Sequence, residues 1–154
     1  MIVNLRELQL VPTDEPAPEG HTFTACSLSR QLEAKYTGLG LYEVEPGQAT
    51  WPYHFELVEE EWLIVISGEL TLRTPDGEST LRAGDVACFP AGASGAHAVW
   101  NSGSETARFA MPSSVARYGD GAVYPDSGTF VVRTPGFEHR GCIGEEVPYW
   151  EGEP

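Results

Sequence analysis

The stretch that decides the fold reads Gly47-Gln-Ala-Thr-Trp-Pro-Tyr-His54-Phe-Glu56-Leu-Val-Glu-Glu-Glu61-Trp-Leu-Ile-Val-Ile-Ser-Gly68. A second stretch reads Gly84-Asp-Val-Ala-Cys-Phe-Pro90-Ala-Gly92-Ala-Ser-Gly-Ala-His97-Ala-Val-Trp-Asn101. In both, histidine and glutamate lie on strand-like segments that Gly and Pro separate by turns. Such side chains on a rigid sheet hold a divalent cation and leave coordination positions open. The two stretches therefore indicate the halves of one metal site, with four candidate side chains: His54, Glu56, Glu61 and His97.

The segments around these stretches are short, rich in strand-forming residues and separated by turns. Trp62 to Ile66 is a continuous apolar run, as expected for a strand covered on both faces. No segment keeps a helical apolar period for more than about two turns. We therefore expect an all-β sandwich or barrel. Its other strands are expected at Tyr36 to Val44, Trp51 to Val58, Leu70 to Arg73, Thr80 to Arg82, Val86 to Phe89, His97 to Trp100, Ala107 to Met111 and Thr129 to Arg133.

Composition divides the chain into one domain with two flanks. The 154 residues are enough for one full core, so a single domain is the default expectation. Residues 1–20 are predicted to be an arm or linker, since Pro12 to Gly20 holds three prolines and three acidic residues. Residues 21–135 form the predicted β-domain. Residues 136–154 form a predicted tail, whose Tyr149 and Trp150 should pack on the barrel or on a partner subunit.

The charge of the chain excludes two classes of partner. The formal net charge is −14, so nucleic acid and anionic membranes would repel the protein. No apolar run reaches the length of a membrane span. The three cysteines show no metal-type or disulfide-framework spacing, and no signal peptide is apparent. These features predict a cytoplasmic protein with reduced thiols.

The two stretches resemble the paired motifs of the cupin superfamily. The first family motif has a Gly, a His-x-His pair, a following Glu and a later Gly; His54-Phe-Glu56, Glu61 and Gly68 follow its spacing. The second has a Gly, a Pro-x-Gly, a His and an Asn, and here it corresponds to Gly84, Pro90-Ala-Gly92, His97 and Asn101, with two extra residues between Gly92 and His97.

The resemblance implies a cupin-type double-stranded β-helix, or jelly-roll barrel, over roughly residues 40–112. It also implies a divalent metal, Fe, Mn or Zn, held inside the barrel by His54, Glu61 and His97. The protein would then act on a small organic molecule, first as a metal-dependent dioxygenase and second as an isomerase. The rival interpretation is a non-catalytic or metal-free cupin that binds or senses a small ligand. A homodimer is the expected assembly.

The main departure from the family motif is Glu56, which stands where a second histidine is expected. His54 and Glu56 are two residues apart and would point to the same face of a strand. Glu56 could be the fourth metal ligand, a catalytic general base beside the metal, or a relic of a lost site paired with Arg108.

The remaining polar candidates have weaker interpretations. His21 and His139 are expected to be surface histidines, and Cys88 a small buried apolar side chain. Asn101 and the motif glycines are expected to serve turns and packing. Most aromatic residues near the two stretches should be core, with one or two lining an apolar pocket; they are Trp51, Tyr53, Phe55, Trp62 and Trp100.

Overall fold

The computed structural model of the chain describes residues 2–13, 16–148 and 151–152. The fold is nearly all β and its sheets are antiparallel, as predicted. A six-stranded sheet has the order β1-β2-β3-β10-β5-β8. Its strands are β1 (Val11–Pro12), β2 (Thr24–Ser27), β3 (Thr37–Val44), β10 (Ala107–Ser114), β5 (Glu61–Ser67) and β8 (Val86–Phe89).

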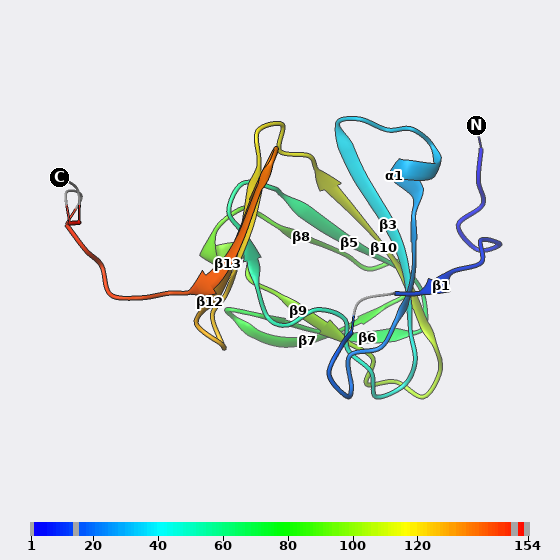
Figure 1. Cartoon of the computed structure of the whole chain (residues 1–154). Helices are drawn as coiled ribbons and strands as arrows, with labels where there is room; N and C mark the ends of the chain where they lie inside the picture. Colours follow the sequence, from blue (N-terminus) through cyan, green and yellow to red (C-terminus); the bar gives the residue numbers. More distant parts are fainter. Residues whose placement is uncertain (1, 14–15, 149–150, 153–154) are drawn as a thin grey trace.

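Two smaller sheets complete the barrel. The three-stranded sheet has the order β7-β6-β9, and the four-stranded sheet the order β13-β12-β11-β4. In Figure 1 the three sheets surround a common interior, with the four-stranded sheet closing one side. The strands are β7 (Gly77–Arg82), β6 (Glu69–Thr74), β9 (Ala98–Trp100), β13 (Phe137–Cys142), β12 (Thr129–Thr134), β11 (Asp120–Tyr124) and β4 (Phe55–Glu56); the helical segments are α1 (Leu28–Gln31) and η1 (Ala93–Gly95).

The main core lies between the six-stranded and three-stranded sheets. Period-two alternation directs Leu63 and Val65 of β5 inward, while Trp62 is exposed on the outer face. Gly68 makes the turn from β5 into β6 with φ +78°, and a Cβ there would lie 2.6 Å from the Cα of Ala107. Only glycine therefore fits this motif position. The buried core residues are Val44, Leu63, Val65, Leu70, Leu72, Phe89, Val99, Ala107, Phe109 and Met111.

Asn101 has the structural role that the sequence predicted. Its side chain is fully buried, and its Nδ2 donates to the carbonyls of Val44 at 2.7 Å and Glu105 at 2.8 Å. Its Oδ1 accepts a hydrogen bond from Gly103 N at 2.9 Å. The asparagine thus satisfies buried backbone groups where β9 ends, close to the end of β3.

Several details differ from the sequence-based expectations. Of the strand expected at Trp51 to Val58, only Phe55–Glu56 forms a strand, β4. The strands β11 and β13 were not expected, because their glycines and charged residues hide the alternation. Cys88 is exposed rather than buried, since it shares the outer face of the sheet with its cross-strand neighbour Trp62.

Both flanks contact or extend the barrel. The strand β1 pairs with β2, and Leu5, Leu8 and Leu10 pack against the second apolar cluster around Leu28. Arg108 secures this arm, because it donates to the carbonyl of Leu8 and pairs with Glu43 at 2.9 Å.

At the other end, the predicted boundary at residue 135 falls in the turn before β13, so the four-stranded sheet continues to Cys142. How the chain divides into domain and flanks stays a prediction. The predicted docking of Tyr149 and Trp150 lies outside the described residues. In the described parts of the chain, no helix has the length and apolar character needed to cross a bilayer.

Candidate metal centre

Backbone hydrogen bonds join the two motif stretches at their histidines. His54 N donates to His97 O at 3.1 Å, and His97 N donates to His54 O at 2.8 Å. Two residues after His54, Glu56 O accepts a further hydrogen bond from Gly92 N at 2.8 Å. This antiparallel bridge places the two imidazole rings 4.7 Å apart, centre to centre. Residues that are 43 positions apart in the sequence therefore form one site.

Each imidazole is oriented by a backbone carbonyl. His54 Nδ1 lies 2.8 Å from Pro52 O, and His97 Nδ1 lies 3.0 Å from Gly95 O. A carbonyl only accepts hydrogen bonds, so each Nδ1 must carry the proton and each Nε2 keeps a free lone pair. The His97 ring also stacks on Phe89, with 3.8 Å between ring centres. Histidines that bind metals are commonly held in this way.

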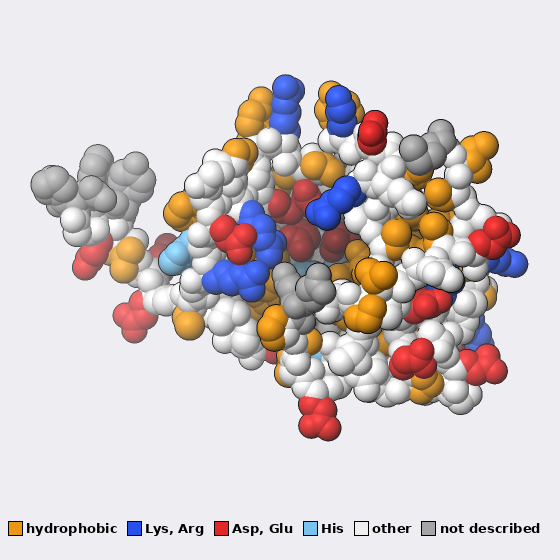
Figure 2. All heavy atoms as spheres, turned by 45° about the vertical axis from the view of Figure 1, so that its right-hand side comes forward, with side chains coloured by type: hydrophobic (Ala, Val, Ile, Leu, Met, Phe, Trp, Pro, Cys, Tyr) orange, Lys and Arg blue, Asp and Glu red, His pale blue; other side chains and the backbone are white. Residues whose placement is uncertain are grey.

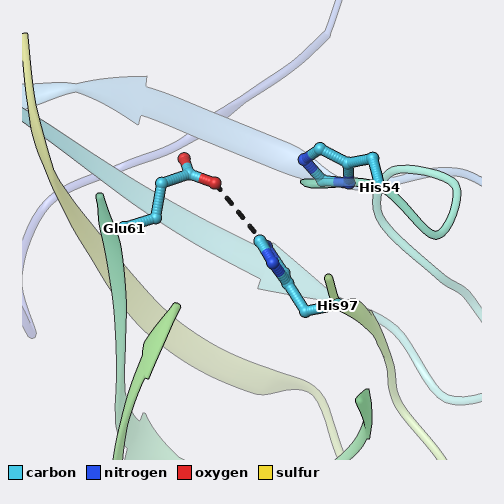
Figure 3. A group of neighbouring side chains, drawn as sticks. All are labelled: His54, Glu61 and His97. Carbon is cyan, nitrogen blue, oxygen red and sulfur yellow. Dashed lines mark ion pairs between the residues drawn. The ribbon is translucent and has the colours of Figure 1, made fainter. Parts of the chain in front are cut away.

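Glu61 brings a carboxylate to the same place from the start of β5. Its Oε2 lies 3.6 Å from His97 Nε2, too far for a hydrogen bond (Figure 3). Both atoms are buried, and neither has a hydrogen-bond partner among the described residues. A buried polar atom without a partner costs about 1–3 kcal/mol. A cation between these two atoms would remove that cost.

The donor set fits a divalent metal ion. One ligand atom from each of His54, Glu61 and His97 lies within 4.8 Å of the others, and Figure 3 shows the three side chains converging. Two imidazoles and one carboxylate suit Fe(II), Mn(II) or Zn(II) and leave coordination positions open. In the parts of the chain that the structure describes, these three residues are a possible metal site.

Glu56 adjoins this group without being part of it. Its Oε1 lies 3.6 Å from His54 Nε2, and β4 pairs it with Ala122 of β11. Arg108 is not its partner, because that arginine binds Glu43 and the N-terminal arm. The interpretation of Glu56 as a carboxylate paired with Arg108 is therefore wrong. The fourth-ligand and general-base roles stay predictions.

Burial changes the protonation of all four side chains. Burial and, secondarily, the neighbouring His54 lower the pKa of His97 to about 4, and burial also lowers the pKa of His54. Burial raises the pKa of Glu61 to about 7, with a smaller contribution from Glu59 and Asp120. Burial, then Glu61 and Asp120, raises the pKa of Glu56 to about 8. At neutral pH the imidazoles are thus neutral and ready to bind a metal, whereas both glutamates can still hold a proton.

The site lies at the side of a cavity of about 370 Å³, a size that suits a small organic molecule. Figure 2 shows a hollow in the surface with acidic side chains on its floor and Lys or Arg side chains around it. The cavity wall combines aromatic, hydroxyl and charged side chains, which include Tyr42, Trp51, Tyr124, Ser27, Ser113, Glu56, Glu61 and Arg133.

Sequence reasoning missed three residues of this region. Asp120 and Tyr124 belong to β11, whose strand character the sequence does not reveal. Arg133 did have a signal, because it ends an expected strand two residues after the buried Val131 and so shares its face. The two other histidines lie outside the group: His21 is bonded to Thr50 O at 2.7 Å, and His139 is exposed on β13.

Comparison with known proteins agrees with this fold. Residues 40–112 match the family model of the cupin domain. A candidate sugar phosphate isomerase from Acidithiobacillus ferrooxidans is 24% identical with a TM-score of 0.83; the match covers 94% of this chain and 91% of that one. A sugar phosphate isomerase of the cupin superfamily from Silicibacter pomeroyi is 21% identical with a TM-score of 0.81, covering 97% and 98%.

A candidate oxalate decarboxylase from Thermotoga maritima is 18% identical with a TM-score of 0.62, covering 75% of this chain and all of the other. At these identities the likeness shows the fold, a double-stranded β-helix. No curated protein matches the sequence.

Proposed function

The chain is a cupin-domain protein, and from this premise we propose that it is a metal-dependent isomerase of a small hydroxylated carbonyl compound. The observation that carries this proposal is the pair of buried, unpartnered atoms Glu61 Oε2 and His97 Nε2 beside His54, at the wall of a cavity. A divalent ion is the group that such a donor set accommodates best.

The protein side of the chemistry follows from how each ligand is held. When bound, the metal supplies Lewis-acid polarisation of a carbonyl or hydroxyl oxygen. His54 and His97 present Nε2 in a fixed orientation, because carbonyls hold both Nδ1 atoms. Glu61 supplies the negative charge. The aromatic walls of the cavity exclude water from the substrate and set its orientation.

Glu56 is the proposed proton carrier. Its carboxylate lines the cavity beside the metal ligands, with Oε1 3.6 Å from His54 Nε2, so it can reach a substrate bound there. Isomerisation needs a base that removes a proton from the hydroxyl-bearing carbon beside the carbonyl and returns it to the former carbonyl carbon, while the hydroxyl proton moves to the carbonyl oxygen; no oxidant is required. In the alternative role, a fourth metal ligand, the bound cation would make the Glu56 carboxylate a weaker base.

Dioxygenase chemistry is the second candidate. Two histidines and one carboxylate are typical of non-haem Fe(II) oxygenases, and this donor set favours the candidate. Isomerisation ranks first because two similar structures covering more than nine-tenths of the chain carry that description. The metal-free binding protein ranks below both, since it leaves the buried pair Glu61 and His97 unexplained. The homodimer and the cytoplasmic location stay predictions; the three free cysteines are compatible with a reducing compartment.

The proposed isomerisation is tested by following the exchange of carbon-bound hydrogen with the solvent. Protein loaded with Mn(II) or Zn(II) is incubated in D₂O with aldoses, ketoses and their phosphorylated or carboxylated forms, and NMR records deuterium incorporation and interconversion. We expect Glu56→Gln to lower the exchange rate by about 10²–10⁴-fold, as for loss of a general base. Metal content is measured on the same samples. If Glu56→Gln keeps its metal but loses deuterium exchange, Glu56 is the general base. If the variant loses both the metal and the exchange, Glu56 is the fourth metal ligand.

Oxygen consumption, measured with an oxygen electrode, tests the dioxygenase alternative. Oxygen consumed in proportion to substrate by the Fe(II)-loaded protein, with no deuterium incorporation, would replace isomerisation by oxygenase chemistry. Glu78→Gln, on the exposed strand β7, is the matched control and should behave like the wild type.

A further inference from the structure

We propose that two arginines at the mouth of the cavity, Arg133 and Arg117, form a subsite for an anionic group of the substrate. The inference rests on the proposed function and narrows its substrate to a carboxylated or phosphorylated compound. A second cavity, of about 360 Å³, adjoins the first and shares Glu56 and Arg133 with it. Arg117 lines the second cavity only. The second cavity thus places both arginines next to the cavity of the metal centre.

The guanidinium of Arg133 is available for a ligand. It stands opposite Asp120 across β11 and β12, yet the two form no ion pair. One reason is that Asp120 Oδ1 accepts a hydrogen bond from Val58 N at 2.9 Å. The contact of Arg133 with Glu138, at 3.6 Å between Nε and Oε2, is longer than a hydrogen bond. Within the described residues, the Arg133 guanidinium donates no hydrogen bond.

Other arginines of the chain are engaged more closely. Arg73 pairs with Asp126 at 2.6 Å, and Arg108 pairs with Glu43 at 2.9 Å. Arg133 adjoins both cavities and is held only by its longer contact with Glu138, at 3.6 Å, so its guanidinium can turn to an anion there. The planar guanidinium also matches the paired oxygens of a carboxylate or phosphate.

Arg117 adds a second cation on a positioned loop. The loop is fixed beside it, because Ala116 N donates to Glu59 Oε1 at 2.7 Å. Among the described residues Arg117 forms no ion pair; its guanidinium carbon lies 5.8 Å from the centre of the Tyr118 ring. Arg117 precedes β11 and Arg133 lies near the end of β12; because these strands are antiparallel, with Asp120 opposite Arg133, both arginines come from the same end of the strand pair.

Three carboxylates line the same cavity and oppose an anion: Glu56, Glu59 and Asp120. Two of them are already used by the protein, since Glu59 and Asp120 each accept a backbone N–H. Their remaining charge would repel an anion, and the two arginines would offset that repulsion. The subsite therefore selects substrates by charge at the entrance, apart from the metal centre.

The test measures binding by calorimetry with inorganic phosphate, ribose 5-phosphate, ribonate and ribose as probes. The proteins are the wild type, Arg133→Gln, Arg117→Gln and, as the matched control, Arg140→Gln. Arg140 lies on the neighbouring strand β13 and lines neither cavity. We expect ribose 5-phosphate or ribonate to bind more tightly than ribose. Arg133→Gln should weaken the anionic probes about ten-fold or more, as loss of a charge-assisted hydrogen bond does, and Arg140→Gln should not.

The two anionic sugars distinguish phosphate from carboxylate as the natural group. Equal affinity for ribose and both anionic sugars overturns the proposal, and so does equal anion affinity of Arg133→Gln and Arg140→Gln. Metal content of each sample separates this failure from failure of the proposed function. Full metal with no preference for anions removes the subsite alone, whereas a wild type without metal that still selects anions removes the metal-dependent function and keeps the subsite.

Discussion

At the scale of single residues, the site depends on where protons are. His54 and His97 keep Nε2 free because Pro52 and Gly95 accept their Nδ1 protons. Burial keeps both imidazoles neutral and raises the pKa of Glu61 to about 7 and of Glu56 to about 8. Metal binding must therefore displace a proton from Glu61, and metal affinity should fall as the pH drops below about 7.

The shifted pKa values of these side chains also predict how the stability of the metal-free protein depends on pH. A glutamate whose pKa is raised from 4.5 binds more protons in the folded than in the unfolded state, so stability falls as the pH rises through that window. His54 and His97, with pKa values lowered from 6.5, act in the opposite direction, but only below pH 6.5. Between pH 6.5 and 8 the effect of the two glutamates on stability thus remains. We therefore expect the Tm of the metal-free protein to fall as the pH rises over this range.

Thermal unfolding in chelator measures this trend. Glu56→Gln should flatten the fall in Tm, because a neutral amide has no proton to lose, whereas the exposed control Glu78→Gln should keep it. A Tm that stays level or rises from pH 6.5 to 8 in the wild type would contradict these pKa values.

At the scale of elements, the short helix η1 positions His97. Gly95 of η1 lies against Pro90, and a Cβ at this position would stand 1.8 Å from the Pro90 carbonyl oxygen. The two extra residues of the second motif are thus accommodated in a compact turn. Gly95 O also accepts the Nδ1 proton of His97. The loop therefore fixes both the place and the tautomer of the histidine.

Gly95→Ala tests this coupling of loop and ligand. We expect a loss of about 1–3 kcal/mol in the free energy of unfolding, typical of overpacking in a well-packed site, and weaker metal binding because His97 moves. Gly144→Ala is the control, since a Cβ there meets no atom within 4 Å. Denaturant unfolding with and without metal measures both effects. Unchanged stability of Gly95→Ala would show that the loop is freer than its contacts indicate.

Some of the strands, turns and site residues could be predicted from the sequence, and others could not. The strand β5 follows from its apolar run, and the motif glycine Gly68 marks a turn that only glycine fits. The three residues His54, Glu61 and His97 could be grouped because their motif spacing is specific. The sequence could not place Arg108, Asp120 or Arg133, because their roles depend on which strands become neighbours. Cys88 was misplaced since period two alone does not tell the inner face of β8 from the outer.

At the scale of the whole molecule, three sheets surround a common interior (Figure 1). It holds an apolar core and, beside the metal centre, a cavity. The bridge between His54 and His97 lies where the cavity wall meets the four-stranded sheet, through β4. The sheet that carries Arg133 thus contributes both a wall of the site and its entrance.

The most direct test of the central claim is the metal content of the full-length protein purified without chelators. Elemental analysis should find about one divalent ion per chain, as for a single three-ligand site. His97→Ala and Glu61→Gln should lose it, while His139→Ala, exposed on β13, should retain it. A folded wild type that holds no metal, and gains none with Fe(II), Mn(II) or Zn(II), would contradict the account.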